Sequence, residues 1–213
     1  MSKFYFVYDL IDELYIRQNY FQYFDLNEGD TVVDAGANIG LFTVLAAKKL
    51  NNTGKVIAIE PDDNNFEILK ENIKINELTN VIPVKKGLWK ENTTLEFNLG
   101  LRPGEHSLHE NDQMSGEKVK IDCITLDNLL SELNIKSVNF IKMDIEGAEI
   151  EALQGCQTIL KSESVKWVIE ALHIVEGQPT YKKIVPVIEA SNYHLLTPVD
   201  NYRGTIYASK QVL

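Results

Sequence analysis

The sequence predicts an α/β protein built on a doubly wound, mostly parallel β-sheet. Short apolar segments of strand character alternate along the 213 residues with segments of helical periodicity. The stretch 31–40 (TVVDAGANIG) predicts a strand, a tight glycine turn and a helix start, which is how such a domain opens a ligand site. Near the end of the chain, 193–199 and 204–210 predict a final antiparallel hairpin. The chain is long enough to bury one substantial core.

The first 28 residues are unusually aromatic and predict a helical cap ahead of the main domain, residues 29–213. Apolar side chains at intervals of three and four predict an amphipathic helix from about Asp9 to Phe24. We expect its aromatic side chains to pack on the sheet edge. The alternative is that Tyr15 or Tyr20 lines a substrate pocket.

The turn after the first strand predicts the cofactor. Asp34 stands at the first position of what would otherwise be a glycine-rich phosphate loop, and its carboxylate would repel a pyrophosphate. The ammonium and sulfonium groups of S-adenosylmethionine suit a carboxylate better. The residues expected to contact this cofactor are Asp34, Gly36, Ala37, Asn38 and Gly40. The alternative is an ordinary turn in which Asp34 caps the next helix.

A second carboxylate follows the next strand. The segment 55–60 (KVIAIE) ends at Glu60 and Pro61, beside the glycine loop if the two strands are neighbours. The two carboxylate oxygens of Glu60 can accept both hydroxyls of a ribose, although an NAD ribose would serve equally well. The alternative is a solvated carboxylate at the start of a helix over 63–75, near Asp62 or Asp63.

The middle of the chain predicts an adenine site and a substrate-facing insertion. A third strand over 80–86 is followed by Gly87 and Trp89, which we expect beside the adenine, with Trp89 either stacking on it or packed in the core. A strand over 93–99 then leads into the polar segment 100–116, which contains His106 and Ser107. We expect these two residues to contact substrate. The alternative is that this segment is a disordered surface loop without a functional role.

Two later strands are followed by acidic and imidazole side chains, which we expect at the same edge of the sheet. After a strand over 118–124 and a short helix capped by Thr125, the strand 138–143 ends in three acids, Asp144, Glu146 and Glu149, and a helix that continues to Leu160. A single N-cap needs one acid, so three favour a functional site in the crevice where these sheets bind ligands. The fifth strand, within 165–173, supplies Glu170 and His173, and a helix over 179–190 follows it.

Composition limits the partners. Hydrophobic residues make up 44% of the chain, charged residues 24%, and the net charge is −10 without a long Lys/Arg run. Nucleic acids and anionic membranes are bound through clustered cations, so we expect neither as a partner. Two cysteines, Cys123 and Cys156, have no metal-ligand spacing, and we predict a reduced, cytoplasmic protein. No segment is long and apolar enough to predict a membrane span or a secretory leader.

Five motifs together resemble the FkbM-type S-adenosylmethionine-dependent methyltransferases of the class I superfamily, over roughly residues 30–173. They are DAGANIG (34–40), AIEPDDNNFEILKENI (58–73), TLDNLL (125–130), FIKMDIEGAE (140–149) and IEALH (169–173). The resemblance implies a Rossmann-like, seven-stranded, mostly parallel sheet with a C-terminal antiparallel hairpin. It also implies methyl transfer to a hydroxyl of a sugar, lipid or secondary metabolite. By this carry-over Asp34, Gly36, Asn38, Gly40 and Glu60 match the cofactor motif, and Asp144 and Glu146 match the acidic motif.

For the chemistry we expect His173 or Asp144 to act as general base, with Glu146 and Glu170 orienting the base or the acceptor. A divalent metal held by Asp144, Glu146 and His173 is an alternative, but no ligand spacing demands one and we predict none. An NAD-dependent reductase, or an inactive small-molecule-binding module of the same fold, remain the competing interpretations. Calorimetry with S-adenosylhomocysteine and NAD in parallel would separate them.

Overall fold

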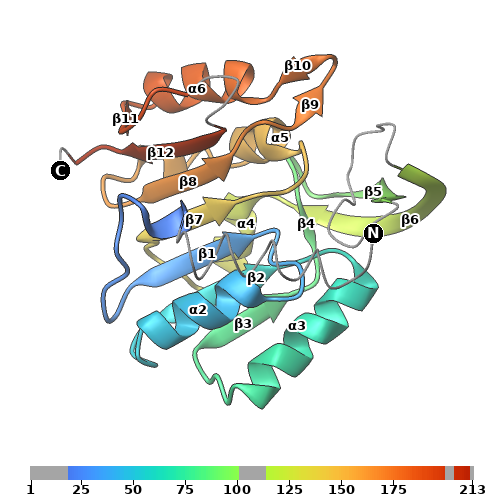
Figure 1. The fold of residues 1–213 in the computed structure, drawn as a ribbon, viewed down its shortest axis with the longest axis vertical. Helices are drawn as coiled ribbons and strands as arrows, with labels where there is room; N and C mark the ends of the chain where they lie inside the picture. The colour runs from blue at the N-terminus through green and yellow to red at the C-terminus, as the bar shows by residue number, and fades with distance from the viewer. Residues whose placement is uncertain (1–18, 101–113, 200–203, 212–213) are drawn as a thin grey trace.

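The computed structural model describes residues 19–100, 114–199 and 204–211 and has a central seven-stranded sheet, shown in Figure 1. The strand order is β11-β12-β8-β7-β1-β2-β3. Its five parallel strands are β1 (Thr31–Ala35), β2 (Lys55–Ile59), β3 (Val81–Val84), β7 (Phe140–Met143) and β8 (Lys166–Glu170). At one edge β12 (Thr205–Ser209) runs antiparallel to β8, and β11 (His194–Leu195) runs antiparallel to β12. The predicted fold class is therefore confirmed.

Helices cover both faces of this sheet, and side chains alternate between the two layers along each strand. Val33 of β1 lies in one cluster with the helices α4 (Leu126–Glu132), α5 (Glu149–Gln154) and α6 (Tyr181–Ala190). Its neighbour Val32 faces α2 (Leu41–Lys49) on the other side. The helix α3 (Asp63–Ile75) packs through Phe66 and Leu69 beside α2 (Figure 1). None of the helices within the described ranges is long and apolar enough to cross a bilayer.

The aromatic residues before β1 are part of the core on the α2 side. Tyr20, Phe21 and Phe24 are buried, and Phe21 stacks on Phe42 of α2 with ring centroids 5.5 Å apart. The helix that the sequence predicts up to Phe24 is wrong at its C-terminal end. Within the described residues only a short 3₁₀ turn, Asn19–Phe21, is helical, and the chain is irregular from there to β1. Tyr15 lies outside the described residues.

A second, three-stranded sheet projects from the C-terminal end of the main sheet, at the right of Figure 1. It pairs β4 (Gly87–Leu88) and β5 (Thr93–Gly100) with β6 (Met114–Ile124) in the order β4-β6-β5. We call this unit the β-arm. The predicted insertion 100–116 is therefore too long, because its last residues belong to β6. His106 and Ser107 lie outside the described residues.

The chain around the acidic loop departs from the sequence prediction in one further way. The helix expected to run from the acidic cluster to Leu160 is interrupted: α5 ends at Gln154, and a 3₁₀ turn, Ile159–Lys161, follows. Gly155 lies at the break, where a Cβ atom would come within 2.5 Å of the Trp89 carbonyl oxygen. Close packing of this backbone on the start of the β-arm ends the helix early. A last small hairpin, β9 (Ile174–Val175) and β10 (Gln178–Pro179), follows β8.

Candidate active site

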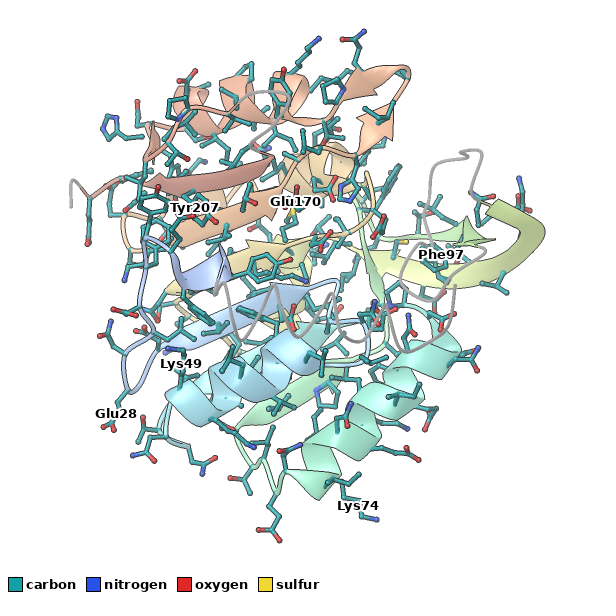
Figure 2. All side chains as sticks on the ribbon, in the orientation of Figure 1. Glu28, Lys49, Lys74, Phe97, Glu170 and Tyr207 are labelled. Atoms are coloured by element: carbon teal, nitrogen blue, oxygen red, sulfur yellow. The ribbon has the colours of Figure 1, made fainter. Side chains whose placement is uncertain are left out.

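A deep pocket opens at the C-terminal ends of β1, β2 and β7, where a doubly wound sheet places its ligands. Its empty space, open mouth included, is about 960 Å³. The walls come from four segments: the turn 36–39, the residues after β2, the start of the β-arm, and the loop 144–148 after β7. Phe97 and Ile121 of the β-arm complete the apolar side, and Figure 2 shows Phe97 on that arm.

The glycine turn has a backbone geometry that larger side chains would disrupt. Gly36 has φ +78°, and a Cβ atom there would lie 1.8 Å from the carbonyl oxygen of Asp144. The amides of Gly36 and Ala37 both donate to the Ile59 carbonyl, at 3.0 and 2.9 Å, which ties the turn to the end of β2. Gly40, with φ +89°, is the N-cap of α2 and, unlike the other predicted residues of this turn, is not among the pocket-lining residues. The turn thus presents backbone to the pocket at a place where only glycine lets β7 approach so closely.

Glu60 lines the pocket at the position the sequence predicts. Its Oε2 accepts the amide of Asn38 at 2.8 Å, and its Oε1 accepts the amide of Asp62 at 2.9 Å. Burial raises the pKa of Glu60 to about 7, although the two backbone hydrogen bonds act in the opposite direction. Each oxygen keeps a lone pair, so the carboxylate can accept two further hydroxyl groups. Pro61 and Gly87 also line the pocket, as predicted.

Asp34 does not face the pocket, contrary to the prediction from the sequence. Its carboxylate is fully buried, is not part of the pocket wall, and accepts the Thr43 hydroxyl at 2.5 Å. The Nζ of Lys142 lies 3.2 Å from its Oδ1 and also donates to the Gly36 carbonyl at 2.7 Å. The prediction that the Asp34 carboxylate faces a cationic group of the ligand is therefore wrong. Lys142 balances that charge, and Lys142 itself lines the pocket.

The loop after β7 carries the acidic residues and is organised by Glu149. Asp144 and Glu146 line the pocket, and Glu146 adopts φ +55°. The side chain of Glu149 is completely buried, and its Oε1 accepts the amides of Ile145 and Gly147 at 2.9 and 3.3 Å. Glu149 therefore fixes the backbone that presents the other two acids.

His173 follows β8 and meets all three acids. Its Nδ1 lies 3.1 Å from Glu149 Oε1, and its Nε2 lies 3.6 Å from Asp144 Oδ1 and 3.5 Å from Glu146 Oε2. Burial alone would lower the pKa of His173, but the charges of Glu149, Asp144 and Glu146 outweigh it and raise the pKa to about 10. With no cation bound, the three carboxylates favour the protonated imidazole. A base must first be unprotonated, so these surroundings disfavour His173 as the general base, and its catalytic role stays a prediction.

Two predicted residues lie away from this cluster. Trp89 packs beside Phe97, Ile121 and Cys123 of the β-arm, as the core alternative predicts, and is not among the pocket-lining residues. Glu170, labelled in Figure 2, ends β8, where its Oε2 accepts the Thr205 hydroxyl of β12 at 3.0 Å. It joins two strands at the sheet edge and is not grouped with the other acids of the described residues.

Lys142 is a residue of the site that the sequence does not predict, because a lysine in a buried strand gives no signal of its partner. Glu149 is predicted only as one of three clustered acids, without the contact to His173. Tyr20 appears in the sequence analysis only as an alternative, yet it lines the pocket and donates its hydroxyl to Asp144 Oδ2 at 3.3 Å.

Comparisons with known proteins agree with this geometry. Residues 34–195 match the family model described as the methyltransferase FkbM domain. Hexuronic acid methyltransferase AglP of Haloferax volcanii is 31% identical over 150 residues, which cover 70% of this chain and 58% of that protein. The 31-O-demethyl-FK506 methyltransferase FkbM of Streptomyces tacrolimicus is 24% identical over 196 residues, covering 78% of this chain and 72% of that protein.

Among solved structures, a methyltransferase FkbM from Methylobacillus flagellatus superposes with a TM-score of 0.66 at 21% identity. The match covers 92% of this chain and 47% of that one, so it shows the shared fold. The chain spans 58% of the length of the Haloferax enzyme. A second structure of the same fold, a SAM dependent methyltransferase from Aquifex aeolicus, superposes with a TM-score of 0.52 at 16% identity over 98% of each chain. The chain belongs to the FkbM family of S-adenosylmethionine-dependent methyltransferases.

Proposed function

We propose that this protein methylates a hydroxyl group on a sugar, a lipid or a secondary metabolite. The observation that carries the proposal is the position of Asp144 and Glu146, two carboxylates on the pocket wall beside the glycine turn. An alcohol must lose its proton as its oxygen is methylated, and carboxylates beside the reacting oxygen can accept that proton. The names of the two relatives, one acting on a hexuronic acid and one on an oxygen of FK506, support this acceptor class.

The cofactor fits the residues present. Gly36 and Ala37 give it a surface with little side-chain bulk, and Glu60 faces the pocket with lone pairs for the two ribose hydroxyls. Leu88 and Phe97 supply an apolar wall on which the adenine can rest. When bound, the cofactor supplies a methyl group whose bond to sulfur breaks, with its electron pair staying on sulfur, as the new O–CH₃ bond forms.

We assign the proton-accepting role to Asp144. It lies at the end of β7, its backbone amide bonds to the Ala35 carbonyl at 3.1 Å, and its side chain contacts both Tyr20 and His173. The position of its carboxylate is therefore fixed from two sides. His173, held in the protonated form by the acids around it, orients Asp144 rather than competing for the proton. Positioning of this kind supplies much of the acceleration in a displacement reaction.

The test is a methyl-transfer screen with tritiated S-adenosylmethionine over uronic acids, neutral glycosides, lipid alcohols and macrocyclic alcohols. Each alcohol is paired with its amine or thiol analogue. We expect turnover on one alcohol class, a loss of about 100-fold or more in Asp144→Asn, and unchanged turnover in Asp63→Asn, an exposed aspartate at the start of α3. Methylation of the amine analogue in preference to the alcohol, or full turnover in Asp144→Asn, would contradict the proposal.

A further inference from the structure

We propose that Asp144, Glu146 and His173 form a binding site for a divalent cation, with Glu149 orienting the imidazole. The three residues each offer one ligand atom, and these atoms all lie within 4.8 Å of one another. The role we give the ion rests on the proposed function, because it would polarise the acceptor hydroxyl. The existence of the site does not rest on it, and binding can be measured without any acceptor.

The distances suit ligands of one ion better than hydrogen bonds. His173 Nε2 lies 3.6 Å from Asp144 Oδ1 and 3.5 Å from Glu146 Oε2, beyond the usual N–H···O length of about 2.7 to 3.2 Å. Ligand atoms about 2.1 Å from a metal lie about 3.0 Å apart in an octahedron and about 3.4 Å apart in a tetrahedron. The two distances from His173 Nε2 thus exceed the octahedral spacing by about 0.5 to 0.6 Å and the tetrahedral one by about 0.1 to 0.2 Å.

Glu149 supplies a second, independent observation. Its side chain is fully buried, and its Oε2 has no hydrogen-bond partner within the described part of the chain. Its Oε1 lies 3.1 Å from His173 Nδ1, on the side of the ring away from the two outer carboxylates. A carboxylate behind one ring nitrogen holds the proton there and turns the lone pair of the other nitrogen toward a metal. A carboxylate is one of the partners that usually hold the second ring nitrogen of a metal-binding histidine.

The local charge also favours a cation. Three carboxylates surround a single imidazole, and the nearby ammonium group of Lys142 is already engaged by Asp34 and by the Gly36 carbonyl. Two carboxylate oxygens and one imidazole nitrogen form a donor set that suits Mn²⁺, with softer Zn²⁺ as a competitor and Mg²⁺ disfavoured by the nitrogen. Three protein ligands leave positions of an octahedral ion open for water and for an acceptor.

Those open positions would face the pocket, because Asp144 and Glu146 both belong to its wall. A hydroxyl bound to the ion would have a lowered pKa and would lose its proton more readily to a carboxylate oxygen of the pair that does not ligate the metal. His173 would then act as a neutral ligand.

The experiment is an electron paramagnetic resonance titration of the metal-stripped full chain with Mn²⁺, in which bound ions lose the six-line signal of the free aquo ion. We expect one Mn²⁺ per chain in the wild type. Glu146→Gln and His173→Gln should each bind about 10-fold more weakly or worse. Glu170→Gln is the matched control, because this acid lies at the end of β8, just before His173, but bonds to Thr205 instead of joining the cluster.

Circular dichroism checks that each variant is folded, and the wild-type titration stands on its own if one is not. No Mn²⁺ binding to the wild type, or equal weakening in Glu170→Gln, would overturn the metal site. Either result would leave the hydroxyl methyltransferase proposal standing, because that is judged by the acceptor screen. Binding of Mn²⁺ together with turnover only on amines would support the metal site but contradict the proposal that the acceptor is a hydroxyl group.

Discussion

Asp34 and Lys142 are partners across neighbouring parallel strands, paired directly in register, and their side chains meet on the same face of the sheet. Burial alone would lower the pKa of Lys142, but Asp34 and then Asp144 outweigh it and raise that pKa, so the ammonium stays charged. The pair joins β1 to β7 directly below the glycine turn. Its integrity therefore affects both the stability of the sheet and the shape of the cofactor site.

Removing one partner should be costly. Lys142→Met would leave the buried Asp34 carboxylate without its counter-charge, and we expect the free energy of unfolding to fall by about 3 to 5 kcal/mol. The double variant Asp34→Asn/Lys142→Met should recover a large part of that loss, because neither charge then remains buried alone. Urea denaturation of the three proteins measures this. Equal losses in the single and the double variants would show that the charge pair is not the cause.

Gly36→Ala should abolish cofactor binding, because the added Cβ would collide with the Asp144 carbonyl oxygen, a backbone atom that cannot move aside. Gly29→Ala is the matched control. Gly29 has φ +85°, close to the +78° of Gly36, but nothing lies within 4 Å of its Cβ position. Both changes carry the left-handed strain of about 1 to 2 kcal/mol, and only Gly36→Ala adds the collision. Calorimetry with S-adenosylhomocysteine should show near-normal binding by Gly29→Ala and none by Gly36→Ala.

Cofactor affinity should depend on pH through Glu60. Its folded pKa of about 7 means that the carboxylate is partly protonated near neutrality, whereas accepting two ribose hydroxyls favours the charged form. The affinity for S-adenosylhomocysteine should therefore rise between pH 6 and pH 8 and then level off. Glu60→Gln should bind about 10-fold more weakly or worse and lose this pH dependence. An unchanged pH profile in that variant would place the titrating group elsewhere.

The raised pKa of Glu60 should also make the free energy of unfolding fall as the pH rises. Glu60 has a higher pKa in the folded protein than its ordinary value of 4.5, so the folded state retains its proton to higher pH than the unfolded chain does. Its contribution to the free energy of unfolding should be fully present below pH 4.5 and decline as the pH rises through about 7. Comparing the pH dependence of denaturation midpoints of the ligand-free wild type and Glu60→Gln isolates this contribution.

Tyr20→Phe should lower turnover by about 3- to 10-fold, because it removes a hydroxyl that donates to Asp144 while keeping the ring against Phe42. Affinity for S-adenosylhomocysteine and the denaturation midpoint should change little. Tyr23→Phe is the control, since its hydroxyl accepts a hydrogen bond from exposed Gln22. A turnover loss of the same size in Tyr23→Phe would remove Tyr20 from the active site.

The elements of the main sheet and the positions of Glu60, Asp144 and Glu146 could be predicted from sequence, because strand ends in a doubly wound sheet meet at one edge. The Thr125 cap of α4 was equally readable, and its hydroxyl does accept the Asn128 amide. These features depend on residues close in sequence or on a topology that has few alternatives.

The errors come from contacts that no local pattern encodes. The charge of Asp34 is balanced by Lys142, which lies beside it in the fold although it is 108 residues later in the sequence. Similarly, Glu170 looks like a neighbour of His173 along the chain, but alternation along a strand and the pairing of β8 with β12 turn it toward Thr205. The core position of Trp89 and the early end of α5 both depend on how closely the β-arm packs, which is a tertiary effect.

The residues ahead of β1 have a practical consequence for how proteins of this kind are compared and trimmed. The family match begins at residue 34, and every strand of the main sheet lies after residue 30. A shortened protein that began at residue 31 would retain the complete sheet but lose the aromatic side chains that pack against α2 and the phenol that contacts Asp144. An alignment restricted to the matched region would leave out these upstream contacts, and one that began at residue 34 would also cut into β1.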